Sequence, residues 1–241
     1  DLFKYPGIRS DSDMFTLGFR FKPWTSEKAI ADGPDIMAYL KETVAEYGID
    51  KHIRYGQHVL AADWSDADNR WSLVIERDGE QVEISCRFLM ACSGYYNYDE
   101  GYSPEFVGSE DFEGTIVHPQ HWPEDIDFAG KRIVVIGSGA TAITLVPALV
   151  NSGAGQVTML QRSPSYVLAV PARDAWMTAL GQTWAGFAAA VVRWRNILLS
   201  MFLFQLSRRL PRLALQLLFG AARRQLGPGY DGETHFSPAY Q

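Results

Sequence analysis

The feature that most constrains this chain is a turn of small residues directly behind an apolar run. Residues 132–136 read Arg-Ile-Val-Val-Ile, and residues 137–142 read Gly-Ser-Gly-Ala-Thr-Ala. Gly137 allows a tight turn, Gly139 lets the backbone approach a bound group, and Ala142 is small enough for a helix to pack on the strand. The pattern predicts a strand, a turn and a helix whose first N–H groups favour a phosphate.

The residues that follow complete a nucleotide-binding unit. Residues 141–150 are predicted to be the helix, and residues 156–160 the next strand. An NAD site has an acidic residue after this second strand, but this chain has Arg162 and Ser163 there. An arginine and a hydroxyl suit a 2′-phosphate, so the pattern predicts NADPH. The alternative for the glycines alone is an ordinary tight turn.

Composition limits the class of protein. A chain of 241 residues, 47% hydrophobic and 21% charged, can bury a substantial core as one large or two small domains. The net charge of -6 argues against a nucleic-acid partner, and no metal-ligand spacing is present. We expect Cys86 and Cys92 to be core residues. Two cysteines without a secretory signal favour a reduced, cytoplasmic protein.

The region before the nucleotide unit shows helix and strand patterns. Residues 35–47 carry apolar side chains at helical spacing, and Gly48 is expected to end that helix. Residues 87–92 are predicted to form a buried strand. An antiparallel meander with an Asp-Gly hairpin turn is expected from residues 52–55, 58–64, 70–76 and 81–85.

Residues 172–226 form an apolar and basic segment that is predicted to be helical. Its uninterrupted apolar run, residues 197–204, is shorter than the roughly 20 residues that a bilayer requires. A helix lying on a membrane surface through residues 185–225 is left open. The favoured alternative is a helical insertion that covers a substrate cleft or packs on other parts of the protein.

A second motif lies just before the nucleotide unit, where residues 112–123 read F-E-G-T-I-V-H-P-Q-H-W-P. This segment resembles the fingerprint of the Baeyer–Villiger monooxygenases, which are flavoproteins related to the flavin-containing monooxygenases. Residues 1–14 and 92–102 are similar to the mycobacterial ethionamide-activating members of that family. The fingerprint positions are Phe112, Gly114, His118, Trp122 and Pro123.

The resemblance implies an α/β fold with two dinucleotide-binding, Rossmann-like domains, present here in part, with a helical insertion. The family's first Gly-rich turn and its active-site arginine have no match in this sequence. We therefore expect a piece of a longer protein, inactive as an oxygenase by itself. The implied parts are the remainder of an FAD-binding domain (1–98), a connecting segment (99–130), an NADPH-binding unit (131–171) and a helical insertion leading toward the active site (172–241).

The implied activity is that of an enzyme that uses FAD, NADPH and O2 to oxidise small molecules. Ketones would give esters or lactones, and sulfides or thioamides would be oxidised too. The alternatives are an N- or S-oxygenating flavin-containing monooxygenase and a non-catalytic NADPH-binding module. A flavin disulfide reductase is disfavoured because the sequence has no Cys-x-x-Cys pair.

Residue roles follow from the same resemblance. Asp11 would be catalytic by orienting the arginine and hydrogen-bonding the cofactors, although Ser-Asp-Ser-Asp is also good turn chemistry. His118 and Trp122 would couple the two domains, with a catalytic base at His118 less favoured. Val59 would contact FAD through its backbone and would otherwise be plain core. The implied cofactor-binding positions are Arg9, Ser10, Asp11, Val59, Gly137, Ser138, Gly139, Ala140, Thr141, Ala142, Ile143, Thr144, Arg162 and Ser163.

Overall fold

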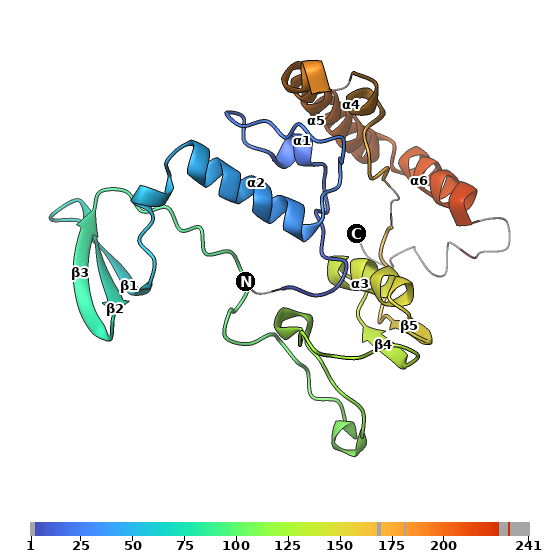
Figure 1. Cartoon of the computed structure of the whole chain (residues 1–241), viewed down its shortest axis with the longest axis horizontal. Helices are drawn as coiled ribbons and strands as arrows, with labels where there is room; N and C mark the ends of the chain where they lie inside the picture. The colour runs from blue at the N-terminus through green and yellow to red at the C-terminus, as the bar shows by residue number, and fades with distance from the viewer. Residues whose placement is uncertain (1–2, 168–169, 181, 227–230, 232–241) are drawn as a thin grey trace. The chain divides into compact units, whose positions relative to one another are not determined.

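The computed structural model describes residues 3–167, 170–180, 182–226 and 231 (Figure 1). The chain divides into two compact units, one of residues 1–39 and 103–241 and the other of residues 40–102. Helix α2 (Gly33–Glu46) runs from the first range into the second. It matches the predicted helix, and Gly48 follows it with a φ of +57°.

The smaller unit is built on an antiparallel sheet in the order β1-β2-β3 (Figure 1). Asp78 and Gly79 have φ angles of +54° and +81°, which a two-residue type I′ turn requires. Leu73 and Ile75, two positions apart on one face of the sheet, are buried. The predicted meander is confirmed for the strands β1 (Gln57–Ser65), β2 (Arg70–Arg77) and β3 (Glu80–Cys86).

Two strand predictions in this unit are wrong. Residues 52–55 are not a strand, because η1 (Asp50–His52) is a 3-10 turn followed by irregular chain. Residues 87–92 form no strand and are mostly exposed. No described strand lies beside them to accept their backbone hydrogen bonds, and an unpaired backbone is stable only in contact with water. The core prediction fails with them, because Cys92 is exposed and Cys86 is only half-buried.

The larger unit contains the predicted nucleotide unit. Strands β4 (Arg132–Ile136) and β5 (Gln156–Leu160) pair in parallel. Helix α3 (Ala140–Asn151) connects them and packs on both (Figure 1). The strands agree with the prediction, and the helix is one residue longer at each end. Its buried face consists of Ala142, Thr144, Leu145 and Leu149.

The predicted helical segment is confirmed, and it packs on the N-terminal part of the chain. It contains α4 (Ala175–Leu180), η4 (Gln182–Trp184), α5 (Ala185–Arg209) and α6 (Pro211–Leu226). Helix α5 packs beside α1 (Met14–Leu17). The helical segment therefore covers apolar side chains of residues 14–39. The shared core is made of Met14, Phe15, Trp24, Ala29, Ala31, Tyr39, Met177, Ala188, Ala189 and Val192.

Among the described residues, α5 is the helix whose length and composition would allow it to cross a membrane. Arg193 and Arg195 interrupt its apolar residues, so the uninterrupted run remains residues 197–204, as the sequence indicates. Length and composition alone are weak grounds for a span. Ala188, Ala189 and Val192, in its first turns, are buried in the protein core.

Candidate functional site

The glycine turn after β4 leaves open space at the start of α3. Gly137 has a φ of +131°, and its N–H donates to the Leu160 carbonyl at 2.8 Å, so the turn is tied to the end of β5. A Cβ at Gly137 or Gly139 would meet no atom within 4 Å. Gly139 caps α3 without a side-chain hydrogen bond. Uncapped N–H groups beside open space suit a phosphate.

Ser138 joins this turn to the segment after β5. Its hydroxyl donates to the Ser163 carbonyl at 3.1 Å and lies 3.3 Å from the Ser165 hydroxyl. Arg162 is exposed, and no carboxylate in the described ranges pairs with it. The structure thus links the two loops that carry the predicted NADPH positions.

Not every predicted position can offer its side chain to a ligand. Ala142 and Thr144 are buried. The Thr144 hydroxyl donates within the helix to the carbonyls of Ala140 and Thr141, both at 3.1 Å. Ile143 is half-buried. These residues hold α3 in place, which leaves the residues from Gly137 to Thr141 nearest the open space.

The segment of Arg9, Ser10 and Asp11 has a structural role in part. Ser10 is buried, its N–H donates to the Ala31 carbonyl at 2.8 Å, and its hydroxyl accepts from the Ala31 N–H at 3.1 Å. Arg9 and Asp11 are exposed. The turn chemistry expected here is carried by Asp13, whose carboxylate accepts from the Thr16 N–H at 2.9 Å and caps α1. Across the described ranges, no hydrogen bond joins Asp11 to the glycine turn.

Gly7 makes a close contact with α3 that the sequence analysis missed. It has a φ of +81°, and a Cβ there would lie 2.5 Å from the Thr144 carbonyl oxygen and 2.8 Å from the Ala148 Cβ. Only glycine fits this crossing without a shift. The one signal in the sequence is its place after Pro6 in a loop. The contact fixes the N-terminal segment on the helix that begins at the glycine turn.

The fingerprint residues build local structure. Nδ1 of His118 accepts from the Gln120 N–H at 3.2 Å and caps η3 (Pro119–His121). Gln120 is buried, and its carbonyl accepts from the Phe3 N–H at 3.3 Å. No described carboxylate pairs with His118, so the geometry gives it no partner for a catalytic base.

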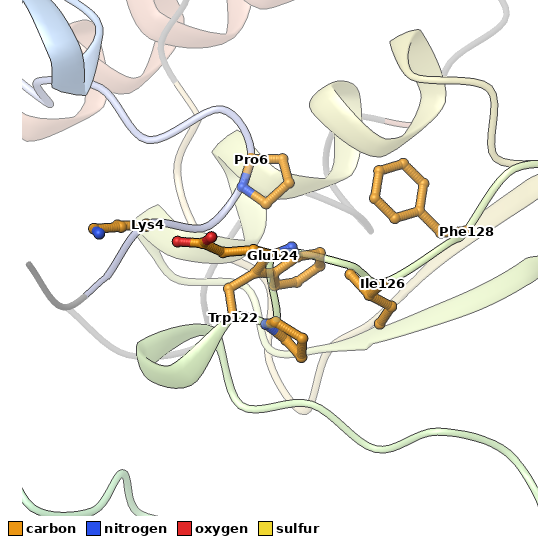
Figure 2. Close-up of a pocket in the computed structure, with 7 residues that line it drawn as sticks. Lys4, Pro6, Trp122, Glu124, Ile126 and Phe128 are labelled. Carbon is orange, nitrogen blue, oxygen red and sulfur yellow. The ribbon is translucent and has the colours of Figure 1, made fainter.

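The aromatic fingerprint residues pack close to their neighbours. The Phe112 ring lies over Gly114, where a Cβ would come within 2.3 Å of it. Trp122 packs edge-on against Phe128 with ring centroids 6.4 Å apart. A pocket lies between the fingerprint segment and the N-terminal segment (Figure 2), lined by Lys4, Pro6, Trp122, Pro123, Glu124, Ile126 and Phe128.

Two points remain, which are the exposure of Val59 and the search for a metal site. Val59 belongs to the smaller unit and is 51% exposed on β1, next to an irregularity in the pairing with β2, so it is not the core residue that its sequence context suggested. Within the part of the chain that the structure describes, no group of three or more His, Cys, Asp or Glu side chains could hold a metal ion.

Known proteins are similar to this chain in sequence. Residues 30–181 match the family of flavin-binding monooxygenase-like proteins. The chain is 59% identical over 241 residues to the FAD-containing monooxygenase EthA of Mycolicibacterium smegmatis, covering 100% of this chain and 49% of that protein. The chain thus spans about half the length of the curated relatives it matches.

Solved structures share the fold. A steroid monooxygenase bound to NADP has a TM-score of 0.61 and 32% identity, over 74% of this chain and 35% of that one. Cyclohexanone monooxygenase from Rhodococcus sp. Phi1, bound to NADP+, has a TM-score of 0.59 and 26% identity, over 73% of this chain and 34% of that one. They confirm the predicted α/β two-dinucleotide-binding fold, present in part. The family match covers more than half of the chain, and the solved structures share its fold. This chain therefore belongs to the flavin-binding monooxygenase-like family.

Proposed function

We propose that the protein, in its full natural length, is an FAD- and NADPH-dependent monooxygenase. It transfers one oxygen atom of O2 to a small ketone, giving an ester or lactone, or to a sulfide or thioamide. The second oxygen atom leaves as water, and NADPH supplies the two electrons. The observation that carries the proposal is the open glycine turn, which Ser138 ties to the segment of Arg162 and Ser163.

The residues of this chain bind and orient the nicotinamide cofactor. The first N–H groups of α3 would hold the pyrophosphate, because nothing fills the space beside Gly137 and Gly139. The unpaired guanidinium of Arg162 and the hydroxyl of Ser163 would hold the 2′-phosphate, since arginine binds phosphate through two parallel hydrogen bonds. EthA is named as FAD-containing, and both solved neighbours carry NADP, which supports the same cofactors here.

Asp11 is the residue of this chain that we assign to the reacting end of the cofactors. Its carboxylate is exposed, and the hydrogen bonds between Ser10 and Ala31 hold the backbone just before it. A carboxylate fixed this way can accept a hydrogen bond from a cofactor amide and orient a neighbouring arginine. The flavin supplies the oxygen chemistry, and the protein supplies orientation and exclusion of water.

The fingerprint segment transmits position between parts of the protein. Through Gln120 it is hydrogen-bonded to Phe3, and four residues later the same N-terminal segment crosses α3 at Gly7. A shift of the segment that carries His118 and Trp122 would therefore also move the N-terminal segment where it contacts α3. We assign these two residues a coupling role rather than an acid–base role.

The free cysteines fit a reduced, cytoplasmic compartment.

The test uses full-length protein loaded with FAD and compares Arg162→Gln with wild type. A charge-assisted hydrogen bond contributes about 1.5–3 kcal/mol, so kcat/KM for NADPH should fall by about 10- to 150-fold while that for NADH changes little. Arg132→Gln is the matched control, because Arg132 is also exposed but begins β4, at the far end from the turn. Equal losses for both cofactors would contradict the assignment.

Products decide the type of oxygenation. With ketones and thioethers under air, esters or lactones identified by mass support the proposal. Sulfoxides or N-oxides alone would instead favour the N- or S-oxygenating alternative. NADPH binding with no oxidised product from any substrate would favour the non-catalytic module.

A further inference from the structure

The loop that carries Arg162 is held to the glycine turn on both sides. Before Arg162, the Gly137 N–H donates to the Leu160 carbonyl at 2.8 Å. After it, the Ser138 hydroxyl donates to the Ser163 carbonyl at 3.1 Å. Two consecutive residues of the turn therefore hold the two ends of one short loop. Only the second contact depends on a side chain, so the residue at position 138 decides whether it forms.

The register of the parallel strands makes these contacts possible. Ile136, the last residue of β4, lies opposite Leu160, the last residue of β5. The turn and the loop therefore leave the sheet side by side at the same edge. Ser138 and Arg162 each lie two residues beyond this pair, so the hydroxyl and the arginine start from neighbouring points of the backbone.

The proton of the Ser138 hydroxyl is already used within the protein. A serine hydroxyl carries one O–H and donates one hydrogen bond. That proton goes to the Ser163 carbonyl, so in the 3.3 Å contact with Ser165 it is the Ser165 hydroxyl that donates. The oxygens of an ionised pyrophosphate accept hydrogen bonds and cannot donate them. While both contacts are in place, the Ser138 side chain therefore has no hydrogen bond to offer a pyrophosphate.

The segment behind Arg162 is stiff between its two contacts. Pro164 lies between Ser163 and Ser165, and its ring fixes its own φ and restricts the residue before it. The Ser138 hydroxyl thus holds one rigid tripeptide, to which Arg162 is directly joined. A ligand binds more weakly in proportion to the fraction of molecules whose binding group is out of place. Holding the backbone beside Arg162 therefore strengthens whatever this side chain binds.

We propose that Ser138 is a positioning residue for specificity toward the 2′-phosphate, which holds the Arg162 loop in place and does not itself bind the cofactor. The inference rests on the proposed function, in which Arg162 holds that phosphate. NADPH and NADH carry the same pyrophosphate and differ only in the 2′-phosphate. A side chain that positions Arg162 therefore affects NADPH alone, whereas a side chain that binds the pyrophosphate affects both cofactors.

The test compares Ser138→Ala with wild type in full-length, FAD-loaded protein. A hydrogen bond between neutral groups is worth a factor of about 2 to 13, so the ratio of kcat/KM for NADPH to that for NADH should fall by about this factor. The dissociation constants of NADP+ and NAD+, measured by calorimetry without turnover, should change in the same ratio. Ser165→Ala loses one of the two contacts and should give a smaller fall. Ser138→Thr keeps the hydroxyl and should keep the wild-type ratio within about twofold.

The matched control is Ser152→Ala, which removes a hydroxyl at the other end of α3 and should leave both cofactors bound as in wild type. Equal losses for NADPH and NADH in Ser138→Ala would show that this side chain binds the pyrophosphate. No loss for either cofactor would show that the hydroxyl does not hold the loop. Each of these results overturns the inference, and a selective loss of NADPH in Arg162→Gln would still support the proposed function. Equal losses for both cofactors in Arg162→Gln would overturn both.

Discussion

Removal of the Asp174 carboxylate should loosen α4 without disturbing the sheet of the smaller unit. Asp174 is 8% exposed, and one of its oxygens accepts from the N–H groups of Trp176 at 2.9 Å and Met177 at 3.2 Å. Its other oxygen accepts from Arg195 of α5, whose guanidinium lies 5.1 Å from the centre of the Trp176 ring. One carboxylate therefore caps α4 and ties it to α5.

The two roles have different magnitudes. An N-cap side chain is worth about 1 kcal/mol, and a hydrogen bond to a charged group about 1.5–3 kcal/mol. Asp174→Ala loses both contributions, about 2.5–4 kcal/mol of local stability. The open state of α4 should therefore become roughly 70 to 900 times more populated. Asp174→Asn keeps an oxygen for the cap and loses only the ionic part.

The assay is hydrogen–deuterium exchange of peptides covering residues 175–180, since exchange reports local opening. Peptides of the sheet, residues 57–86, serve as the internal control and should be unchanged. Exchange of α4 should follow the order wild type, Asp174→Asn, Asp174→Ala. An α4 exchange rate in Asp174→Ala within threefold of wild type would refute the reasoning, as would an equal acceleration in the sheet.

The protection of α4 should also depend on pH. Burial by itself raises the pKa of Asp174, but the hydrogen bond from Arg195, the N–H groups of Met177 and Trp176, and the Arg195 charge outweigh it and hold the pKa below its usual range. The ionised group stabilises the folded state above the unfolded pKa of about 3.9, and this stabilisation is lost as the pH falls through the lower folded pKa. Protection factors should be equal at pH 7 and pH 5 and fall only in stronger acid, and Asp174→Asn should lack that fall.

Three further substitutions separate packing from ligand binding. Gly7→Ala should cost about 2–4 kcal/mol in thermal stability, because its Cβ meets backbone at 2.5 Å, whereas Gly56→Ala, with a positive φ and open space, should cost only about 1 kcal/mol; equal costs would contradict the contact. Gly139→Val should leave the melting temperature unchanged and raise the KM for NADPH at least about tenfold, because it fills the space beside the turn; an unchanged KM would count against the phosphate site. His118→Ala should lower stability by about 1 kcal/mol through the lost cap and leave kcat within about threefold, while a hundredfold fall in kcat would reveal a catalytic base.

The elements with local signals could be predicted from the sequence. The β4–α3–β5 unit and the hairpin at Asp78 and Gly79 follow from an apolar run beside a glycine turn and from a dipeptide that favours two positive φ angles. The strand prediction for residues 87–92 was wrong because an apolar run indicates burial but does not show that a neighbouring strand is there to pair with it. The prediction that Val59 and Cys92 are buried was wrong for the same reason, since exposure depends on what packs nearby.

The site was predictable where two neighbouring strands bring their ends together. Parallel pairing of β4 and β5 places Ser138 beside Ser163, so sequence order was sufficient. Gly7 contacts α3 from far away in the chain, and its place after Pro6 indicates a loop but not which helix that loop crosses. Asp174 could have been found, because an aspartate directly before an apolar helical pattern is a common N-cap.

The core shared by residues 14–39 and 177–192 has a consequence during synthesis of the protein. Its first half leaves the ribosome about 140 residues before its second half, and at about 5–20 residues per second this takes roughly 7–28 s. For that time Phe15, Trp24 and Tyr39 have no partner from α4 or α5 to cover them. The nascent chain should therefore bind chaperones until α5 emerges, and slow codons between positions 40 and 176 should lower its soluble yield.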